Sequence, residues 1–162
     1  MKKMTLGFVM LMGIIALPSI SFSQATTNQQ VADQIMGMVK AQWAAEIADP
    51  ANTSSIFKDF ADDYTEFNAD FSTRVEGKST NMKLSEPAGK DPNRTMASEM
   101  LNPKVQVYGD AAILTYNYAG VSKNKDNEMK PVRAKSTRVY VKQGGSWKLV
   151  HANFAPDPLP KY

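Results

Sequence analysis

Six side chains in this 162-residue sequence could bind or transform a small molecule. They are one arginine, one histidine, one glutamate and three tyrosines: Arg138, His151, Glu66, Tyr64, Tyr116 and Tyr118. Arginine suits carboxylates because its planar guanidinium donates two parallel hydrogen bonds. Histidine exchanges protons near neutral pH, and a glutamate does so if burial raises its pKa. This set indicates either an anion-binding pocket or an acid/base site.

Arg138 lies in a segment of alternating polarity, in which Ser136, Arg138 and Tyr140 share one face of a predicted strand. Two interpretations of Arg138 remain open. It could anchor an anionic group inside a pocket. It could instead pair with a carboxylate such as Glu66 or Glu76 and hold the sheet to a neighbouring element.

The tyrosines and Glu66 also allow two interpretations each. Tyr116 and Tyr118 share a face and could present their hydroxyls to a cavity, or they could pack in the core or at an interface. Tyr64 and Glu66 share a face of an earlier strand. Glu66 could be a proton acceptor in a pocket, or an exposed carboxylate on a strand edge.

His151 is the single histidine of the chain. Regular alternation predicts that it shares a face with Trp147, Leu149 and Asn153, and that Phe154 points the other way. A lone histidine in a strand is more often structural than catalytic. At most one of His151 and Phe154 should therefore line a cavity.

Composition argues against several other sites. One histidine and no cysteine cannot supply a usual zinc site, and no carboxylate cluster has the spacing of a calcium or magnesium loop. We expect no metal and no cofactor. The basic residues number 19 and the acidic ones 16, and two of the lysines, Lys2 and Lys3, precede an apolar run. Without those two lysines the net charge is +1, which gives no reason to expect nucleic-acid binding.

The amino terminus has the pattern of a secretory signal peptide. Lys2 and Lys3 precede the uncharged apolar run 5–17, and small residues follow at Ser21 and Ser23. We predict a signal peptide at residues 1–23, with cleavage after Ser23 or, as an alternative, after residue 25. The remaining residues 24–162 suit one domain. The mature protein is then expected in the periplasm or outside the cell, with no membrane association.

The first half of the mature chain is predicted to be mainly helical. An apolar stripe at i+4 spacing predicts a helix that starts at Thr27 or Asn28 and ends at Asp49-Pro50: Val31, Ile35, Val39, Trp43 and Ile47. The following segments are predicted in turn to be a short helix after residue 53, strands at 64–68 and 71–75, a helix at 77–84 and a loop at 85–93.

The last third, residues 100–158, alternates between apolar and polar positions with period two. Turn residues at 108–110, 123–127 and 144–145 divide it into four antiparallel strands. Helices followed by such strands predict an α+β domain. The long helix should lie on one face of a strongly curved antiparallel sheet and close it like a cone, with a mouth that admits a small ligand.

Motifs in this part of the chain resemble the association domain of calcium/calmodulin-dependent protein kinase II, and more broadly the SnoaL-like, nuclear transport factor 2-like superfamily. The matching segments are Met100-Leu101-Asn102-Pro103, Val105-x-Val107, Gly109-Asp110, Tyr116, Thr137-Arg138-Val139, Trp147-Lys148 and Val150-His151, with Phe60-Ala61-Asp62-Asp63 and Val75-Glu76-Gly77 upstream. The resemblance implies a cystatin-like roll and a pocket whose arginines hold carboxylate-like ligands. Arg138 matches one such arginine, whereas Tyr118 and Phe154 stand where two others are expected. It implies no kinase activity.

Two classes of function follow. We favour an exported domain that binds a small carboxylate or apolar molecule, or that assembles into a homodimer or larger ring, without catalysis. Apolar residues on the second face of a predicted strand, Ile113, Ala119 and Val121, favour assembly through the outer face of the sheet. The alternative is an isomerase, dehydratase or cyclase of the ketosteroid-isomerase-like type, which uses acid/base residues in the same pocket.

Overall fold

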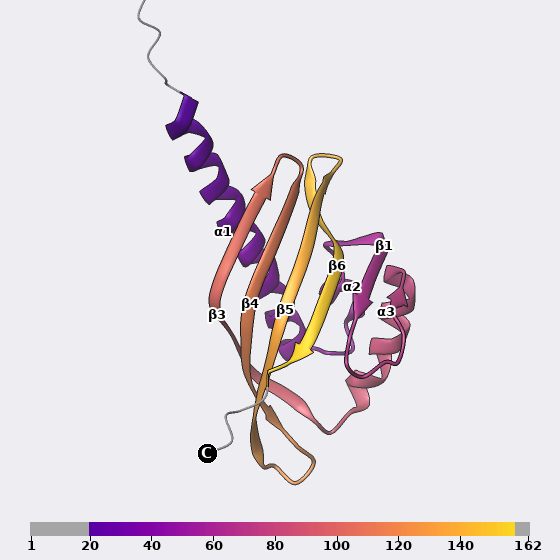
Figure 1. The fold of residues 1–162 in the computed structure, drawn as a ribbon. Helices are drawn as coiled ribbons and strands as arrows, with labels where there is room; N and C mark the ends of the chain where they lie inside the picture. Colours follow the sequence, from indigo (N-terminus) through magenta and orange to yellow (C-terminus); the bar gives the residue numbers. More distant parts are fainter. Residues whose placement is uncertain (1–19, 158–162) are drawn as a thin grey trace, which may run out of the picture.

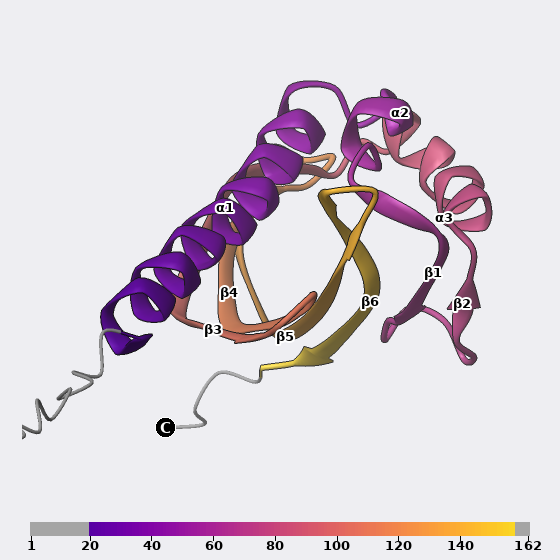
Figure 2. The same cartoon turned by 90° about the horizontal axis from the view of Figure 1, so that it is seen from above.

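The computed structural model describes the backbone of residues 20–157 and the side chains of residues 27–157. A six-stranded, strongly curved sheet wraps around one long helix, and the sheet does not close into a barrel (Figure 1, Figure 2). In chain order the elements are α1 (Ile20–Ala48), α2 (Thr53–Ile56), β1 (Phe60–Phe67), β2 (Val75–Glu76), α3 (Lys78–Ser85), the 3-10 helix η1 (Glu86–Lys90), β3 (Arg94–Tyr108), β4 (Ala111–Lys123), β5 (Met129–Gln143) and β6 (Ser146–Pro156). The predicted α+β class and curved sheet are confirmed.

The strands lie in the order β2-β1-β6-β5-β4-β3. Strands β3 to β6 form the predicted antiparallel meander, and the turns between them fall where the sequence places them. Gly144 and Gly145 both have positive φ values, 56° and 83°, as a tight hairpin turn requires. The pairing of β1 with β6 is parallel, so the sheet is not wholly antiparallel as predicted.

Helix α1 packs its apolar stripe against the concave face of the sheet (Figure 2). Ile35, Val39 and Trp43 are buried at successive i+4 steps. The stripe ends there, because Ile47 is 38% exposed one residue before the helix ends. The helix also begins earlier than predicted, at Ile20, so the expected cleavage point after Ser23 lies within it. Most of the predicted signal peptide, residues 1–19, lies outside the described residues.

Three predicted elements differ from the structure. The strand predicted at 71–75 is reduced to the two residues of β2, and Phe71 is exposed because the chain bends there instead of pairing. The loop predicted at 85–93 contains η1, which has Pro87 in its first turn, where proline favours helix entry. Strand β3 starts at Arg94, before the predicted position 100, because β4 is long enough to pair with it throughout. Among the described helices, none is long and apolar enough to cross a membrane.

Candidate functional site

A cavity of about 460 Å³ opens on the concave side of the sheet, between α1, the α2–β1 segment, α3 and the inner faces of β4 to β6. This volume is typical of small-molecule sites. Five of the six predicted site residues line it: Arg138, Tyr116, Tyr118, Tyr64 and Glu66. The cavity also includes Phe154, which the resemblance places at a pocket position. His151 is not among its lining residues.

Arg138 projects inward from β5 and is only 3% exposed. Its Nε donates a hydrogen bond to the Tyr116 hydroxyl at 3.0 Å, and its Nη1 donates one to Oε1 of Gln42 at 2.7 Å. The guanidinium also lies 5.4 Å from the centre of the Phe154 ring, within cation–π range. Within the described part of the chain, no carboxylate comes within 4.0 Å of Arg138, so the ion pair with Glu66 or Glu76 does not form.

Glu66 is buried, and the alternative of an exposed edge carboxylate is wrong. Strand β1 is flanked by β2 and β6 at this position, where Glu66 is paired with both neighbours. One carboxylate oxygen accepts a hydrogen bond from the Tyr64 hydroxyl at 2.7 Å, and the other accepts one from Nδ2 of Asn68 at 2.9 Å. Burial, and then the neighbouring Glu66, raise the pKa of Tyr64. Tyr64 therefore keeps its proton and donates a hydrogen bond to the carboxylate.

Two polar residues of α1 also face the cavity, and the sequence interpretation missed both. Gln42 and Glu46 lie one helical turn apart and line the wall next to Arg138. Burial raises the pKa of Glu46, and its attraction to Arg138 partly offsets this rise. A sequence signal existed, because both residues flank Trp43 at the edge of the apolar stripe, where a polar side chain can face the concave side.

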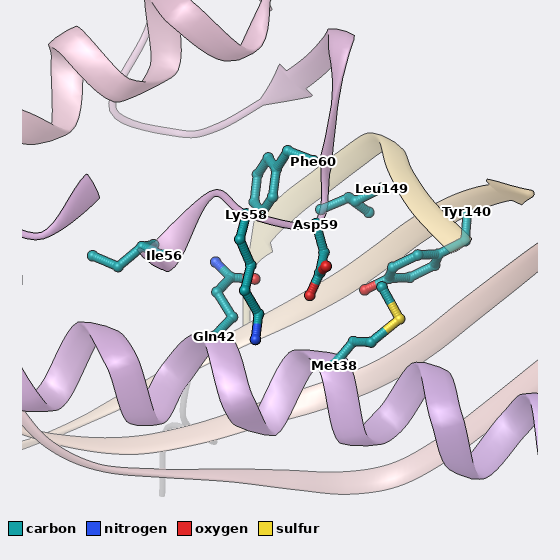
Figure 3. A pocket seen from close by; sticks show the side chains of 8 residues that line it. All are labelled: Met38, Gln42, Ile56, Lys58, Asp59, Phe60, Tyr140 and Leu149. Carbon is teal, nitrogen blue, oxygen red and sulfur yellow. The ribbon is translucent and has the colours of Figure 1, made fainter. Parts of the chain in front are cut away.

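Gln42 also borders a second, much smaller hollow (Figure 3). This hollow has a volume of about 10 Å³, near the lower limit for one water molecule. Figure 3 shows Gln42 and Met38 rising from α1 toward Asp59 and Tyr140. Gln42 therefore lies between the two spaces and borders both of them.

Tyr118 lines the cavity where β4 meets α1. Its hydroxyl is 3.0 Å from the Ser98 hydroxyl, and its ring meets Trp43 edge-on with the centroids 5.4 Å apart. Burial raises the pKa of Tyr118, so the phenol stays neutral. A side chain at Gly120 would overlap the Tyr118 ring, so glycine at this position lets the tyrosine adopt its conformation.

His151 lies on the convex face of the sheet because of a β-bulge. Val139 pairs with His151 but Tyr140 pairs with Leu149, so Val150 is an extra residue in β6. The predicted shared face of His151 with Trp147 and Leu149 is therefore wrong. The His151 ring instead contacts Thr65 Oγ1 through Nδ1, at 2.8 Å. After the bulge, Ala152 and Phe154 face the interior.

A family model of the calcium/calmodulin dependent protein kinase II association domain matches residues 39–158, which include every residue of the site discussed above. The chain belongs to this family. A search of curated proteins found no match.

Solved structures of this association-domain family and of the wider superfamily share the fold. The association domain of the C. elegans kinase is 19% identical, with 82% of this chain and 98% of that chain covered and a TM-score of 0.63. The S. rosetta hub is 20% identical, with 78% and 96% covered and a TM-score of 0.65. A nuclear transport factor 2-like superfamily protein from Salmonella enterica is 14% identical, with 85% and 96% covered and a TM-score of 0.67.

In this association-domain protein the cavity combines a cationic group, two carboxylates and aromatic walls. Arginine stays protonated at any ordinary pH, so Arg138 is a permanent positive charge at a buried position. Such a charge favours an anionic ligand group. Within residues 27–157, no three acidic or histidine side chains gather in a way that would hold a metal ion.

Proposed function

We propose that the mature protein is a binding module whose cavity holds a small carboxylate with an apolar body, anchored on Arg138. One observation carries this proposal: Arg138 is almost fully buried in a cavity of about 460 Å³ and has no carboxylate within ion-pairing distance among the described residues. An unpaired buried charge is costly, and a bound carboxylate would provide the missing counter-charge.

The guanidinium has donors left for such a ligand. Tyr116 and Gln42 accept hydrogen bonds from two of its five N–H groups. These neutral partners orient the guanidinium without neutralising it. Trp43, Phe57, Phe60 and Phe154 surround the cavity and would cover an apolar ligand body.

A thermal-shift titration tests the proposal. Short- and medium-chain carboxylates should raise the melting temperature of the wild type, because a ligand that binds only the native state stabilises it. Arg138→Lys should lose this protection, because lysine cannot reproduce the planar pair of donors. The matched control is Arg133→Lys, an exposed position on the same strand. If no carboxylate protects the wild type while Arg138→Lys lowers its melting temperature sharply, Arg138 has a structural role and the proposal fails.

We further propose that the chain assembles into a homodimer or larger ring through the convex face of its sheet. Ile113, Ala119 and Val121 lie on that face and are only half-buried in the single chain. A second copy would cover them. The family is named for association, which supports the proposal. Light scattering at micromolar concentration should give a mass above that of the monomer, and Ile113→Asp should reduce it; a monomeric wild type would contradict the proposal.

Export is the third part of the proposal. The signal-peptide pattern at residues 1–23 supports secretion or a periplasmic location. Intact-mass spectrometry of the periplasmic and culture fractions should find a chain that begins at Gln24, or two residues later. A mature species that retains Met1 would rule out cleavage.

The contact between Tyr64 and Glu66 favours an acid/base enzyme as a second candidate. A buried carboxylate in the cavity lies 2.7 Å from a tyrosine hydroxyl, an arrangement suited to removing a proton next to a carbonyl. The test is isomerisation of cyclohex-3-enone to its conjugated isomer, followed by absorbance. Enzymatic turnover that disappears in Glu66→Gln would establish this candidate, and a wild type no faster than buffer would exclude it for this substrate.

A further inference from the structure

The cavity contains two opposite charges that do not meet. Arg138 and Glu66 are 3% and 9% exposed, and both side chains line the same space. They come from different strands, β5 and β1, with β6 between them (Figure 2). No ion pair joins them, since neither belongs to any pair within 4.0 Å in the described chain.

Each charge is held in place by uncharged side chains. Tyr116 and Gln42 bind the guanidinium at 3.0 and 2.7 Å. Tyr64 and Asn68 bind the carboxylate at 2.7 and 2.9 Å. Isolated buried charges are expensive, and a fold gains by bringing them together when geometry allows. Here each charge is hydrogen-bonded to neutral partners, and neither has an opposite charge within 4.0 Å in the described chain.

The charge balance argues against a ligand that is only a carboxylate. Glu46 also lines the cavity, near enough to Arg138 to be attracted by it. The cavity therefore contains one basic side chain and two acidic ones. A simple carboxylate would add a third acidic group, whereas a zwitterion brings an ammonium group together with its carboxylate.

We propose that the ligand is a zwitterionic amino acid, with its carboxylate on Arg138 and its ammonium group on Glu66. This inference rests on the proposed function, because it uses the same carboxylate site. The carboxylate would supply the counter-charge of the guanidinium, and the ammonium would supply that of Glu66. Ammonium groups donate strong, charge-assisted hydrogen bonds to carboxylates.

The apolar surroundings add a second requirement, that the amino acid has an apolar part. Phe57 and Phe60 lie along the cavity wall. At its border, Phe71, Leu84 and Val132 are exposed by 40%, 44% and 40%, and all three belong to the lining. An apolar spacer between the two charged groups, or an apolar side chain beside them, would cover this surface.

Isothermal titration with two matched sets of compounds tests the inference. The first set is ε-aminocaproate, caproate and hexylamine; the second is L-phenylalanine, hydrocinnamate and phenethylamine. In each set the first compound has both charges, and the others lack the amine or the carboxylate. The amino acid should bind the wild type more tightly than either relative. Which set binds will show whether the apolar part lies between the charges or beside them.

Glu66→Gln identifies the ammonium site. Glutamine keeps the size of the side chain and an oxygen for Tyr64, but it removes the charge. We expect the affinity for the amino acid to fall roughly 10–100-fold, the equivalent of one charge-assisted hydrogen bond, with no such loss for the simple carboxylate. Glu76→Gln is the matched control, because Glu76 is an exposed carboxylate paired with Arg74.

The outcomes separate this inference from the proposed function. If carboxylates bind as tightly as amino acids and Glu66→Gln changes nothing, the zwitterion inference is wrong while carboxylate binding at Arg138 stands. If only the amines bind and Arg138→Lys has no effect, both the zwitterion inference and carboxylate binding at Arg138 are wrong. If Glu66→Gln does not fold, the wild-type ranking within each set of compounds still decides the inference.

Discussion

The two faces of the curved sheet give neighbouring residues of the same strands different surroundings. On the concave face, Arg138 and Glu66 are buried charges that belong to a ligand-sized cavity. On the convex face, Thr65 and His151 form a half-buried hydrogen bond of 2.8 Å, and neither residue lines the two cavities described above. Helix α1 lies across the concave face, as Figure 2 shows. The direction in which a side chain of this sheet points therefore decides whether it lines the cavity or lies on the convex face.

The largest expected contrast is between Leu114 and its neighbour Ile113. Leu114 points inward and is fully buried, so Leu114→Ala should cost about 2–5 kcal/mol of unfolding free energy at any protein concentration. Ile113 points outward and is half-buried, so in the isolated chain Ile113→Ala should cost roughly 1 kcal/mol. Urea denaturation over a range of protein concentrations measures both. A cost for Ile113→Ala that grows with concentration would indicate that assembly buries this residue.

A smaller contrast concerns the tyrosine hydroxyls. Tyr116→Phe removes the acceptor for Nε of Arg138 and leaves a buried donor unpaired, which should cost about 1–3 kcal/mol of unfolding free energy. Tyr108→Phe is the control, because Tyr108 is 60% exposed and water can replace its bond to Gln106. Equal melting temperatures for the two variants would contradict the assigned role of the Tyr116 hydroxyl.

His151→Ala should have a modest effect, because its bond to Thr65 is partly accessible to water. We expect a loss of about 0.5–1.5 kcal/mol in unfolding free energy. Carboxylate binding should not change, since His151 faces away from the cavity. Titration calorimetry beside thermal denaturation separates the two effects. A large loss of affinity in His151→Ala would show that the convex face contributes to binding.

The smallest effect should appear only as a dependence on pH. Folding raises the pKa of Glu46 above its usual 4.5, so the native state holds this proton more tightly than the unfolded state. The resulting stabilisation is complete below about pH 4.5 and is lost as the pH rises through the native pKa. Relative to the wild type, Glu46→Gln should therefore gain stability as the pH rises above 4.5. Thermal denaturation from pH 4 to pH 8 measures the difference, and a constant difference would contradict the shifted pKa.

The sequence by itself determined most of the architecture. Period-two alternation and turn residues such as Gly144-Gly145 placed the four strands of the meander, because these signals are local. The i+4 stripe placed α1 and its buried residues Ile35, Val39 and Trp43 for the same reason. Strand parity also predicted correctly that Arg138 and Tyr116 face the same side, since no bulge interrupts the pairing of β4 with β5.

Only the tertiary structure decided which of these residues act together. One extra residue at Val150 reversed the direction of His151, and no local pattern in β6 marked that bulge. Glu66 became buried because β6 pairs with β1 in parallel, a contact between strands far apart in the chain. Gln42 reaches Arg138 across 96 positions of sequence. Alternation fixes the face on which a side chain lies, whereas pairing between distant segments fixes its neighbours, its burial and hence its chemistry.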